Sequence, residues 1–285
     1  MAAKGRLQVA LERARQRLEA DKKEADGATK AKAQERAPTV AERQATVQGM
    51  PVFPQVPYDA LACATRRVMI PSTEGPSKAT AAAAYRVLRT RILQRTRANQ
   101  WHTIGVTSPG QGDGKSTTAL NLALSIARER NNNVFLVDLD MRNPKVCEYL
   151  GATPPVDINR YLSGEARAED VLFSIGIDNL TLAGTITSTE HASELLASGR
   201  VEELFGYIRS VAPEPIVLVD LPPLLSTDDA LVVAPKVDAC LLVLAEGKSK
   251  RDGAAKALEL LSEFKLAGIV LNRSRSSVVK DYYSS

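Results

Sequence analysis

Short apolar runs alternate with segments of helical periodicity along most of the chain. Five runs rich in Val, Ile and Leu predict strands, at residues 102–108, 133–140, 216–223, 239–245 and 266–272. Residues 117–130 and 248–264 instead repeat apolar side chains at helical spacing. Strands that are apolar almost throughout and alternate with helices are typical of a parallel sheet buried on both faces. The pattern therefore predicts an α/β fold with a mostly parallel central sheet flanked by helices.

The N-terminal part of the chain has a different character. Residues 1–36 are rich in Ala, Lys, Arg, Glu and Gln and carry a thin apolar stripe, which predicts a basic, partly helical tail. This tail is either solvated or a docking helix for a partner or an anionic membrane face. Residues 37–77 contain many prolines and predict an extended linker. Residues 78–285 then form the predicted main domain, which ends in a short tail with two tyrosines.

A strong helix pattern opens this domain at residues 79–97. Tyr85, Leu88 and Ile92 share one apolar face, and five arginines lie between positions 86 and 97. The arginines are either solvated on a surface helix or part of a charged packing or self-association face.

Charge and cysteine content exclude several classes of protein. Of the net charge of +4, residues 1–70 carry 13 Lys/Arg against 8 Asp/Glu, and the remainder carries 24 against 25. A nearly neutral main domain argues against nucleic-acid binding. Three distant cysteines without C-x-x-C, and two histidines without metal-ligand spacing, argue against disulfide and zinc frameworks. No apolar run is long enough to predict a bilayer span.

The stretch "TSPGQGDGKSTT", residues 107–118, follows the first predicted strand and opens the next helix. The usual phosphate-binding pattern is G-x-x-x-x-G-K-[ST], with Pro109 here at its first position. Glycines allow tight turns that point amide N–H groups at phosphate oxygens, the lysine adds a charge for the β- and γ-phosphates, and the serine hydroxyl can bind Mg²⁺. The predicted nucleotide-binding residues in this stretch are Gly110, Gly112, Asp113, Gly114, Lys115, Ser116 and Thr117.

Further polar residues end the other predicted strands, where ligands bind in such sheets. Asp138 and Asp140 end the second strand in "VDLDMR", and Asp220 ends the third in "VLVDLPP". Carboxylates beside a phosphate loop suit Mg²⁺ and a general base for an incoming hydroxyl. Asn272 and Arg273 end the last strand, where they either contact an adenine ring or form a plain turn.

These motifs, in this order, resemble those of the bacterial tyrosine kinases of capsule and exopolysaccharide export, within the deviant-Walker P-loop ATPases. The motifs are "GDGKST", "DLDMR" and "DLPP", and the resemblance covers about residues 66–285. It implies ATP-dependent tyrosine phosphorylation with Mg²⁺. By resemblance, Lys115, Asp138 and Asp140 are catalytic; Ser116, Asp138, Asp140 and Asp220 bind the metal.

The resemblance also implies partners. The family's acceptors are C-terminal tyrosines, here Tyr282 and Tyr283, offered to a neighbour in a ring-shaped homo-oligomer. Arg86 and Arg89 fit the family's E-x-x-R-x-x-R interface helix, although Ala83 stands at the glutamate position. A membrane polysaccharide copolymerase would activate this cytoplasmic kinase at the inner face of the membrane, and a cognate tyrosine phosphatase would reverse the reaction.

Two alternatives remain open at this stage. Ala83 and the short tyrosine tail also fit a catalytically silent nucleotide-binding regulator of a polysaccharide copolymerase. A MinD/ParA-type ATPase is disfavoured, because those relatives carry a second lysine where this chain has Gly110.

Overall fold

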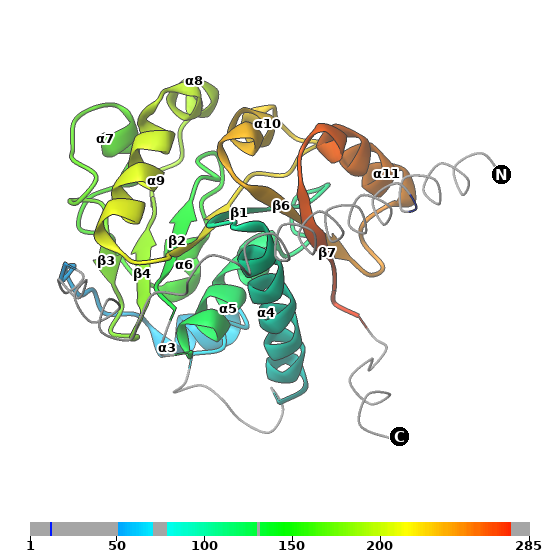
Figure 1. Cartoon of the computed structure of the whole chain (residues 1–285), viewed down its shortest axis with the longest axis horizontal. Coiled ribbons are helices and arrows are strands. Elements are labelled where there is room, and N and C mark those ends of the chain that lie inside the picture. The colour runs from blue at the N-terminus through cyan, green and yellow to red at the C-terminus, as the bar shows by residue number, and fades with distance from the viewer. Residues whose placement is uncertain (1–11, 13–50, 71–78, 130–131, 275–285) are drawn as a thin grey trace, which may run out of the picture.

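A seven-stranded sheet organises the part of the chain that the structure describes (Figure 1). The computed structural model describes residue 12 and residues 51–70, 79–129 and 132–274. The strand order is β3-β4-β2-β5-β1-β6-β7, and every neighbouring pair is parallel except β3 with β4. The strands are β1 (Thr103–Thr107), β2 (Val134–Asp138), β3 (Phe173–Ser174), β4 (Leu180–Ala183), β5 (Ile216–Asp220), β6 (Ala239–Ala245) and β7 (Leu266–Asn272). The predicted α/β class with a mostly parallel sheet is confirmed.

Helices cover both faces of the sheet. One layer comprises α3 (Ala60–Thr65), α4 (Ala79–Asn99), α5 (Lys115–Ala127) and α6 (Val146–Leu150). The other comprises α7 (Ile158–Leu162), α8 (Ala192–Ala197), α9 (Arg200–Val211), α10 (Asp229–Val233) and α11 (Arg251–Leu260), with the 3₁₀ turns η3 (Ala234–Lys236) and η4 (Leu261–Glu263). Within the described residues, no helix combines the length and the apolar character that crossing a bilayer requires.

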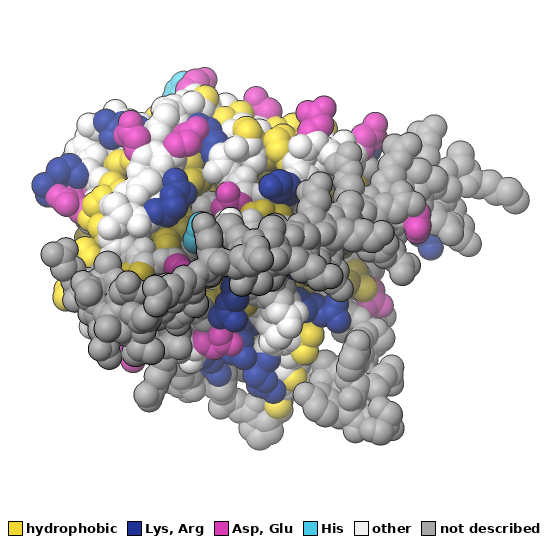
Figure 2. Space-filling model, in the orientation of Figure 1, with side chains coloured by type: hydrophobic (Ala, Val, Ile, Leu, Met, Phe, Trp, Pro, Cys, Tyr) yellow, Lys and Arg dark blue, Asp and Glu magenta, His cyan; other side chains and the backbone are white. Residues whose placement is uncertain are grey.

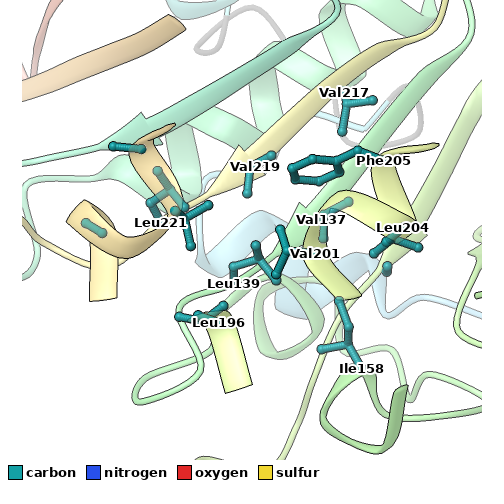
Figure 3. Packing of buried hydrophobic residues seen from close by; sticks show 14 of the residues in the cluster. Val137, Leu139, Ile158, Leu196, Val201, Leu204, Phe205, Val217, Val219 and Leu221 are labelled. Carbon is teal, nitrogen blue, oxygen red and sulfur yellow. The ribbon is translucent and has the colours of Figure 1, made fainter. Parts of the chain in front are cut away.

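The apolar strand residues form two cores, one on each face of the sheet. On the face of α7–α11, Val137, Val217 and Val219 pack beneath Phe205 of α9 (Figure 3). Burying one such side chain stabilises the fold by about 1.5–3 kcal/mol. Because both faces of the sheet are buried beneath helices, the polar residues at the strand ends lie at the carboxyl edge of the sheet.

Two strands lie outside the five predicted ones. β4 is the four-residue run "LTLA", and β3 has only two residues and pairs antiparallel to it. Runs this short carry too little periodicity to be separated from loop sequence. The helix predicted from residue 117 begins at Lys115, so the lysine and serine of the phosphate motif belong to its first turn.

Residues 51–70 differ from the extended linker expected over residues 37–77. They form a strap, which we call the N-terminal strap, that runs past the edge strand β3, includes α3 and contributes side chains to both cores. Phe53, Cys63 and Ile70 are buried in the cores, and the Val56 N–H donates to the Ser174 carbonyl of β3 at 2.8 Å. Although this segment contains several prolines, its apolar side chains still pack into the cores and backbone amides within it still form hydrogen bonds. The rest of the predicted linker, and residues 1–36 apart from residue 12, lie outside the described residues.

Candidate phosphate-binding site

The phosphate loop, residues 109–116, joins β1 to α5 at the carboxyl edge of the sheet. Gly112 and Gly114 have positive φ angles of 74° and 95°, a conformation that favours glycine. A Cβ atom at Gly112 would lie 2.3 Å from the Lys248 Nζ, and one at Gly114 would lie 2.0 Å from the Asn272 Nδ2. The left-handed backbone therefore favours glycine at both positions, and the Lys248 and Asn272 side chains occupy the space that a Cβ atom would take.

Asp113 and Ser108 hold the loop from within. The buried Asp113 carboxylate accepts a hydrogen bond from the Gly110 N–H at 3.0 Å. The Ser108 hydroxyl donates to the Gly110 carbonyl at 2.8 Å. Both bonds bring the start of the loop back towards its middle, so Asp113 belongs to the framework of the loop.

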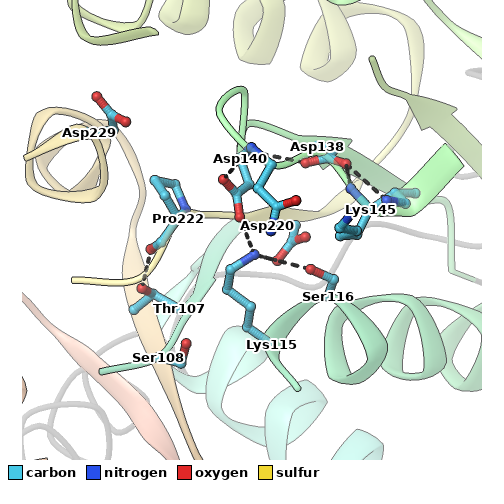
Figure 4. A network of polar contacts seen from close by, with 12 residues as sticks. Thr107, Ser108, Lys115, Ser116, Asp138, Asp140, Lys145, Asp220, Pro222 and Asp229 are labelled. Atoms are coloured by element: carbon cyan, nitrogen blue, oxygen red, sulfur yellow. Dashed lines mark hydrogen bonds and ion pairs between the residues drawn. The ribbon is translucent and has the colours of Figure 1, made fainter. Parts of the chain in front are cut away.

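The lysine of the loop lies among the carboxylates of two other strand ends (Figure 4). The Lys115 Nζ is 2.6 Å from the Asp140 Oδ2 and 3.4 Å from the Asp220 Oδ1. It also donates to the Ser116 Oγ at 3.1 Å. Burial alone would lower the pKa of Lys115, but Asp220 and Asp140 raise it above its ordinary value. The ammonium therefore stays charged in this buried cluster.

Asp138 and Asp220 are paired across the neighbouring strands β2 and β5. The Asp138 Oδ2 accepts from the Lys145 and Val146 N–H groups at 3.1 and 3.0 Å, and its Oδ1 accepts from the Asp140 N–H at 3.1 Å. Burial, followed by the charge of Asp220, raises the pKa of Asp138 to about 8. Burial also raises the pKa of Asp220 to about 6, against the opposing charge of Lys115. Both carboxyls therefore titrate closer to neutral pH than ordinary aspartates do.

The side-chain oxygen ligands present here fit a Mg²⁺ ion whose remaining ligands would be phosphate oxygens of the substrate. No described residue forms a hydrogen bond with the buried Oδ2 of Asp220, and leaving this oxygen unpaired is costly unless a cation or a water binds it. Among the described residues, no three His, Cys, Asp or Glu side chains form a preformed metal cage. Mg²⁺ usually takes only one or two carboxylates, with phosphate oxygens and water as the other ligands. Ser116, Asp140 and Asp220 converge in the way that such a site needs.

Asn272 and Arg273 lie against the outer side of the phosphate loop. The Asn272 Nδ2 donates to the Asp113 carbonyl at 3.0 Å, and the Arg273 guanidinium donates to the Gly112 carbonyl at 2.9 Å. Lys248, from the loop after β6, donates to the neighbouring Gln111 carbonyl at 2.7 Å. Nothing in the sequence pattern pointed to Lys248, which is an exposed lysine in a polar loop.

Arg142, the arginine of the "DLDMR" motif, connects three segments at the rim of the site. Its Nε lies 2.6 Å from the Asp229 Oδ2 at the start of α10, and its guanidinium also donates to the Ser193 Oγ of α8 at 3.3 Å. Ser193 donates a short hydrogen bond to the same Asp229. The "DLDMR" motif marks Arg142 as a candidate site residue in the sequence. No sequence pattern marks its partner Asp229.

The two arginines expected at an oligomer interface have different surroundings. The Arg89 Nε pairs with the Glu129 Oε1 at 2.9 Å and its Nη1 donates to the Ser125 carbonyl at 3.1 Å, within the same chain. Arg86 is exposed on α4. Several Lys and Arg side chains gather in the lower middle of Figure 2, where Figure 1 shows α4 in the same orientation. The predicted acceptors Tyr282 and Tyr283 lie outside the described residues.

Comparisons with known proteins agree with this geometry. The family CbiA, the CobQ/CobB/MinD/ParA nucleotide binding domain, matches residues 104–284. Tyrosine-protein kinase YwqD of Bacillus subtilis is 30% identical over 200 residues, or 70% of this chain and 83% of that protein. Tyrosine-protein kinase CpsD of Streptococcus pneumoniae is 31% identical over 180 residues, or 62% and 78%. The kinase domain of the Escherichia coli tyrosine kinase ETK shares the fold, with a TM-score of 0.63 at 23% identity over 82% of this chain and 95% of that one.

Proposed function

This chain belongs to the CobQ/CobB/MinD/ParA nucleotide-binding family and, within it, to the bacterial tyrosine-protein kinases, and from that premise we propose that it phosphorylates tyrosines of its own C-terminal tail. The phosphoryl donor is ATP, bound through the phosphate loop. The observation that carries the proposal is the convergence of Lys115 with the carboxylates of Asp140 and Asp220 at the mouth of that loop.

Phosphoryl transfer requires the protein mainly to position the reacting groups and to balance the negative charge of the phosphates. Lys115, kept charged by its carboxylate neighbours, lies at the start of α5, where it can reach the β- and γ-phosphates. Thr117, in the same first turn, lies close to the amides that favour anions. These groups hold the transferred phosphoryl group opposite the carboxylates.

The acidic cluster divides between proton transfer and metal binding. Asp138, at the end of β2 and paired with Asp220 on β5, is the base for the tyrosine hydroxyl, because its carboxyl lies beside the carboxylates that face the transferred phosphoryl group. Ser116, Asp140 and Asp220 would hold Mg²⁺, with Asp138 beside them. When bound, the ion supplies positive charge to the β- and γ-phosphate oxygens.

The remaining parts of the proposal concern regulation. Tyr282 and Tyr283 are the acceptors, and they are offered between copies in a ring-shaped oligomer. Each added phosphate brings about −1.5 to −2 charges, which opposes docking beside an acidic site. A membrane polysaccharide copolymerase activates the kinase at the cytoplasmic face, and a tyrosine phosphatase resets it. The kinase thereby regulates capsule or exopolysaccharide polymerisation and export.

Mass spectrometry of phosphotyrosine tests the function directly. Purified protein is incubated with Mg²⁺ and ATP, with and without the cytoplasmic segment of its copolymerase. We expect phosphate on Tyr282 or Tyr283 in the wild type. It should be absent from Lys115→Met and from the Tyr282→Phe/Tyr283→Phe variant. Lys265→Met, which changes an exposed lysine away from the site, should behave as the wild type.

A silent regulator is the second candidate, and Ala83 is the observation that favours it. The family's interface helix carries a glutamate where this chain has Ala83, so the ring that presents acceptor tyrosines lacks one charge pair. Nucleotide binding without phosphotyrosine under both conditions would contradict the kinase proposal and support this regulator.

A further inference from the structure

We propose that Lys248, Asn272 and Arg273 form a clamp on the outer side of the phosphate loop that aims its amide groups at the nucleotide phosphates. The proposal rests on the phosphate-binding role given to this loop above. It makes the three side chains positioning residues, which act on the phosphates through the backbone rather than by contact. It also gives Asn272 and Arg273 a task other than contacting the adenine ring.

The clamp binds three consecutive backbone carbonyls of the phosphate loop. Lys248, Arg273 and Asn272 donate in turn to the carbonyls of Gln111, Gly112 and Asp113, at 2.7, 2.9 and 3.0 Å. Two of the three donors are charged, and charge-assisted hydrogen bonds are stronger than neutral ones. The donors come from two segments, the β6–α11 loop and the end of β7, which converge on one loop.

Peptide geometry turns these contacts into an orientation of the amides. All peptide bonds of the described residues are trans, and in a planar trans peptide the C=O and the next N–H point in opposite directions. Fixing the carbonyls of Gln111, Gly112 and Asp113 outward therefore fixes the following amides, those of Gly112, Asp113 and Gly114, inward. These are the amides with which a glycine-rich phosphate loop binds its anion.

Both segments of the clamp are themselves held in place. The Ser249 Oγ accepts from the Ala245 N–H at 2.8 Å, which fixes the loop that carries Lys248. The Asn272 Oδ1 accepts from the Arg273 N–H at 2.8 Å, which leaves its Nδ2 to donate to the loop. Arg273 has a φ of 58°, a left-handed conformation that is unfavourable for a non-glycine residue. The hydrogen bond from its guanidinium to the Gly112 carbonyl keeps Arg273 in this conformation.

The clamp leaves no Cβ space at the two glycines between its arms. A side chain at Gly112 would meet Lys248, and one at Gly114 would meet Asn272. The absence of side chains at these glycines therefore gives the donors room to approach the loop. The donors in turn hold the loop in its conformation.

Binding measurements with two probes separate the clamp from an adenine contact. Isothermal titration calorimetry is run with Mg²⁺-ATP and with Mg²⁺-tripolyphosphate, which has no base. The variants are Lys248→Met, Asn272→Ala and Arg273→Met, with Lys250→Met as the matched control from the same exposed loop. Thermal melting checks that each variant is folded.

We expect Lys248→Met to weaken both probes by the same factor, about tenfold. Asn272→Ala and Arg273→Met should also weaken both probes alike, Lys248→Arg should restore binding, and Lys250→Met should match the wild type. Loss of ATP binding with unchanged tripolyphosphate binding would overturn the clamp in favour of a base contact. Unchanged binding of both probes in all three variants would overturn it as well. Because the readout is binding, failure of the kinase proposal would leave this result interpretable.

Discussion

At the scale of single residues, the buried carboxylate of Asp229 is a sensitive point outside the phosphate loop. Asp229 is 1% exposed and pairs with Arg142 through two hydrogen bonds. Asp229→Asn would leave Arg142 without its counter-charge at a site only about one-third exposed to solvent. We expect a loss of about 1–3 kcal/mol in the free energy of unfolding at pH 7, measured by urea denaturation. Asp170→Asn, in an exposed ion pair with Arg167, should leave the free energy of unfolding nearly unchanged, because solvent screens that pair.

The same variant has a defined pH dependence. Burial would raise the pKa of Asp229, but hydrogen bonds from Arg142, Ser193 and Thr227 lower it below its ordinary value. A lowered pKa in the folded state adds stability above the pKa of the unfolded state, and that stability is lost as the pH falls. The difference between the wild type and Asp229→Asn should therefore be constant from pH 7 to 5 and shrink below about pH 4. A difference that grows with acidification would contradict this assignment.

The sequence could predict which side chains come together where each residue belongs to a local motif, and the roles of those residues stay predictions. Lys115, Asp140 and Asp220 each stand in a recognisable pattern at a predicted strand end, and a parallel sheet brings such ends together. Lys248 and Asp229 could not be predicted in this way. Their partners are 137 and 87 residues away in sequence, and nothing in the residues around them marks the contact.

At the scale of elements, the N-terminal strap is an integral part of the domain. Ile70 is fully buried at its end, whereas Val52 at its start is 99% exposed. We expect Ile70→Ala to lower the free energy of unfolding by about 2–5 kcal/mol, because it removes buried methyl groups and leaves a cavity. Val52→Ala should change it by less than about 0.5 kcal/mol. Chemical denaturation of both variants checks the pair, and a loss for Ile70→Ala as small as that for Val52→Ala would mean that the strap does not stabilise the fold.

The same strap shows why element prediction failed here and succeeded for the sheet core. The five predicted strands are apolar on both faces, so period and composition agree. In the strap, prolines next to single apolar residues match the composition of a linker. The buried positions of Phe53 and Val68 depend on surfaces formed by α6, β2 and α5, which lie far along the chain.

At the scale of the whole molecule, α4 offers a direct test of the proposed oligomer. Arg86 is exposed, and Arg89 is engaged with Glu129 and Ser125 of its own chain. We expect Arg86→Ala to reduce the oligomer mass in analytical ultracentrifugation without changing the urea midpoint. Arg89→Ala should instead lower the free energy of unfolding by about 0.5–1.5 kcal/mol.

Controls separate an interface from a general effect of charge. Arg97→Ala changes another exposed arginine of the same helix and should alter neither property. Ala83→Glu restores the glutamate of the family pattern and should increase the oligomer mass if the ring uses this helix. An unchanged mass in both Arg86→Ala and Ala83→Glu would exclude α4 as the contact.

The interior position of β1 in the sheet has a consequence for how the protein is made. β1 carries the phosphate loop, yet its two neighbours in the sheet are β5 and β6, and Thr103 pairs with Val217. At a synthesis rate of about 5–20 residues per second, β1 leaves the ribosome on the order of ten seconds before β5 does. During that interval its edges have no sheet partner, so this nascent chain should depend on chaperones until the C-terminal half has emerged.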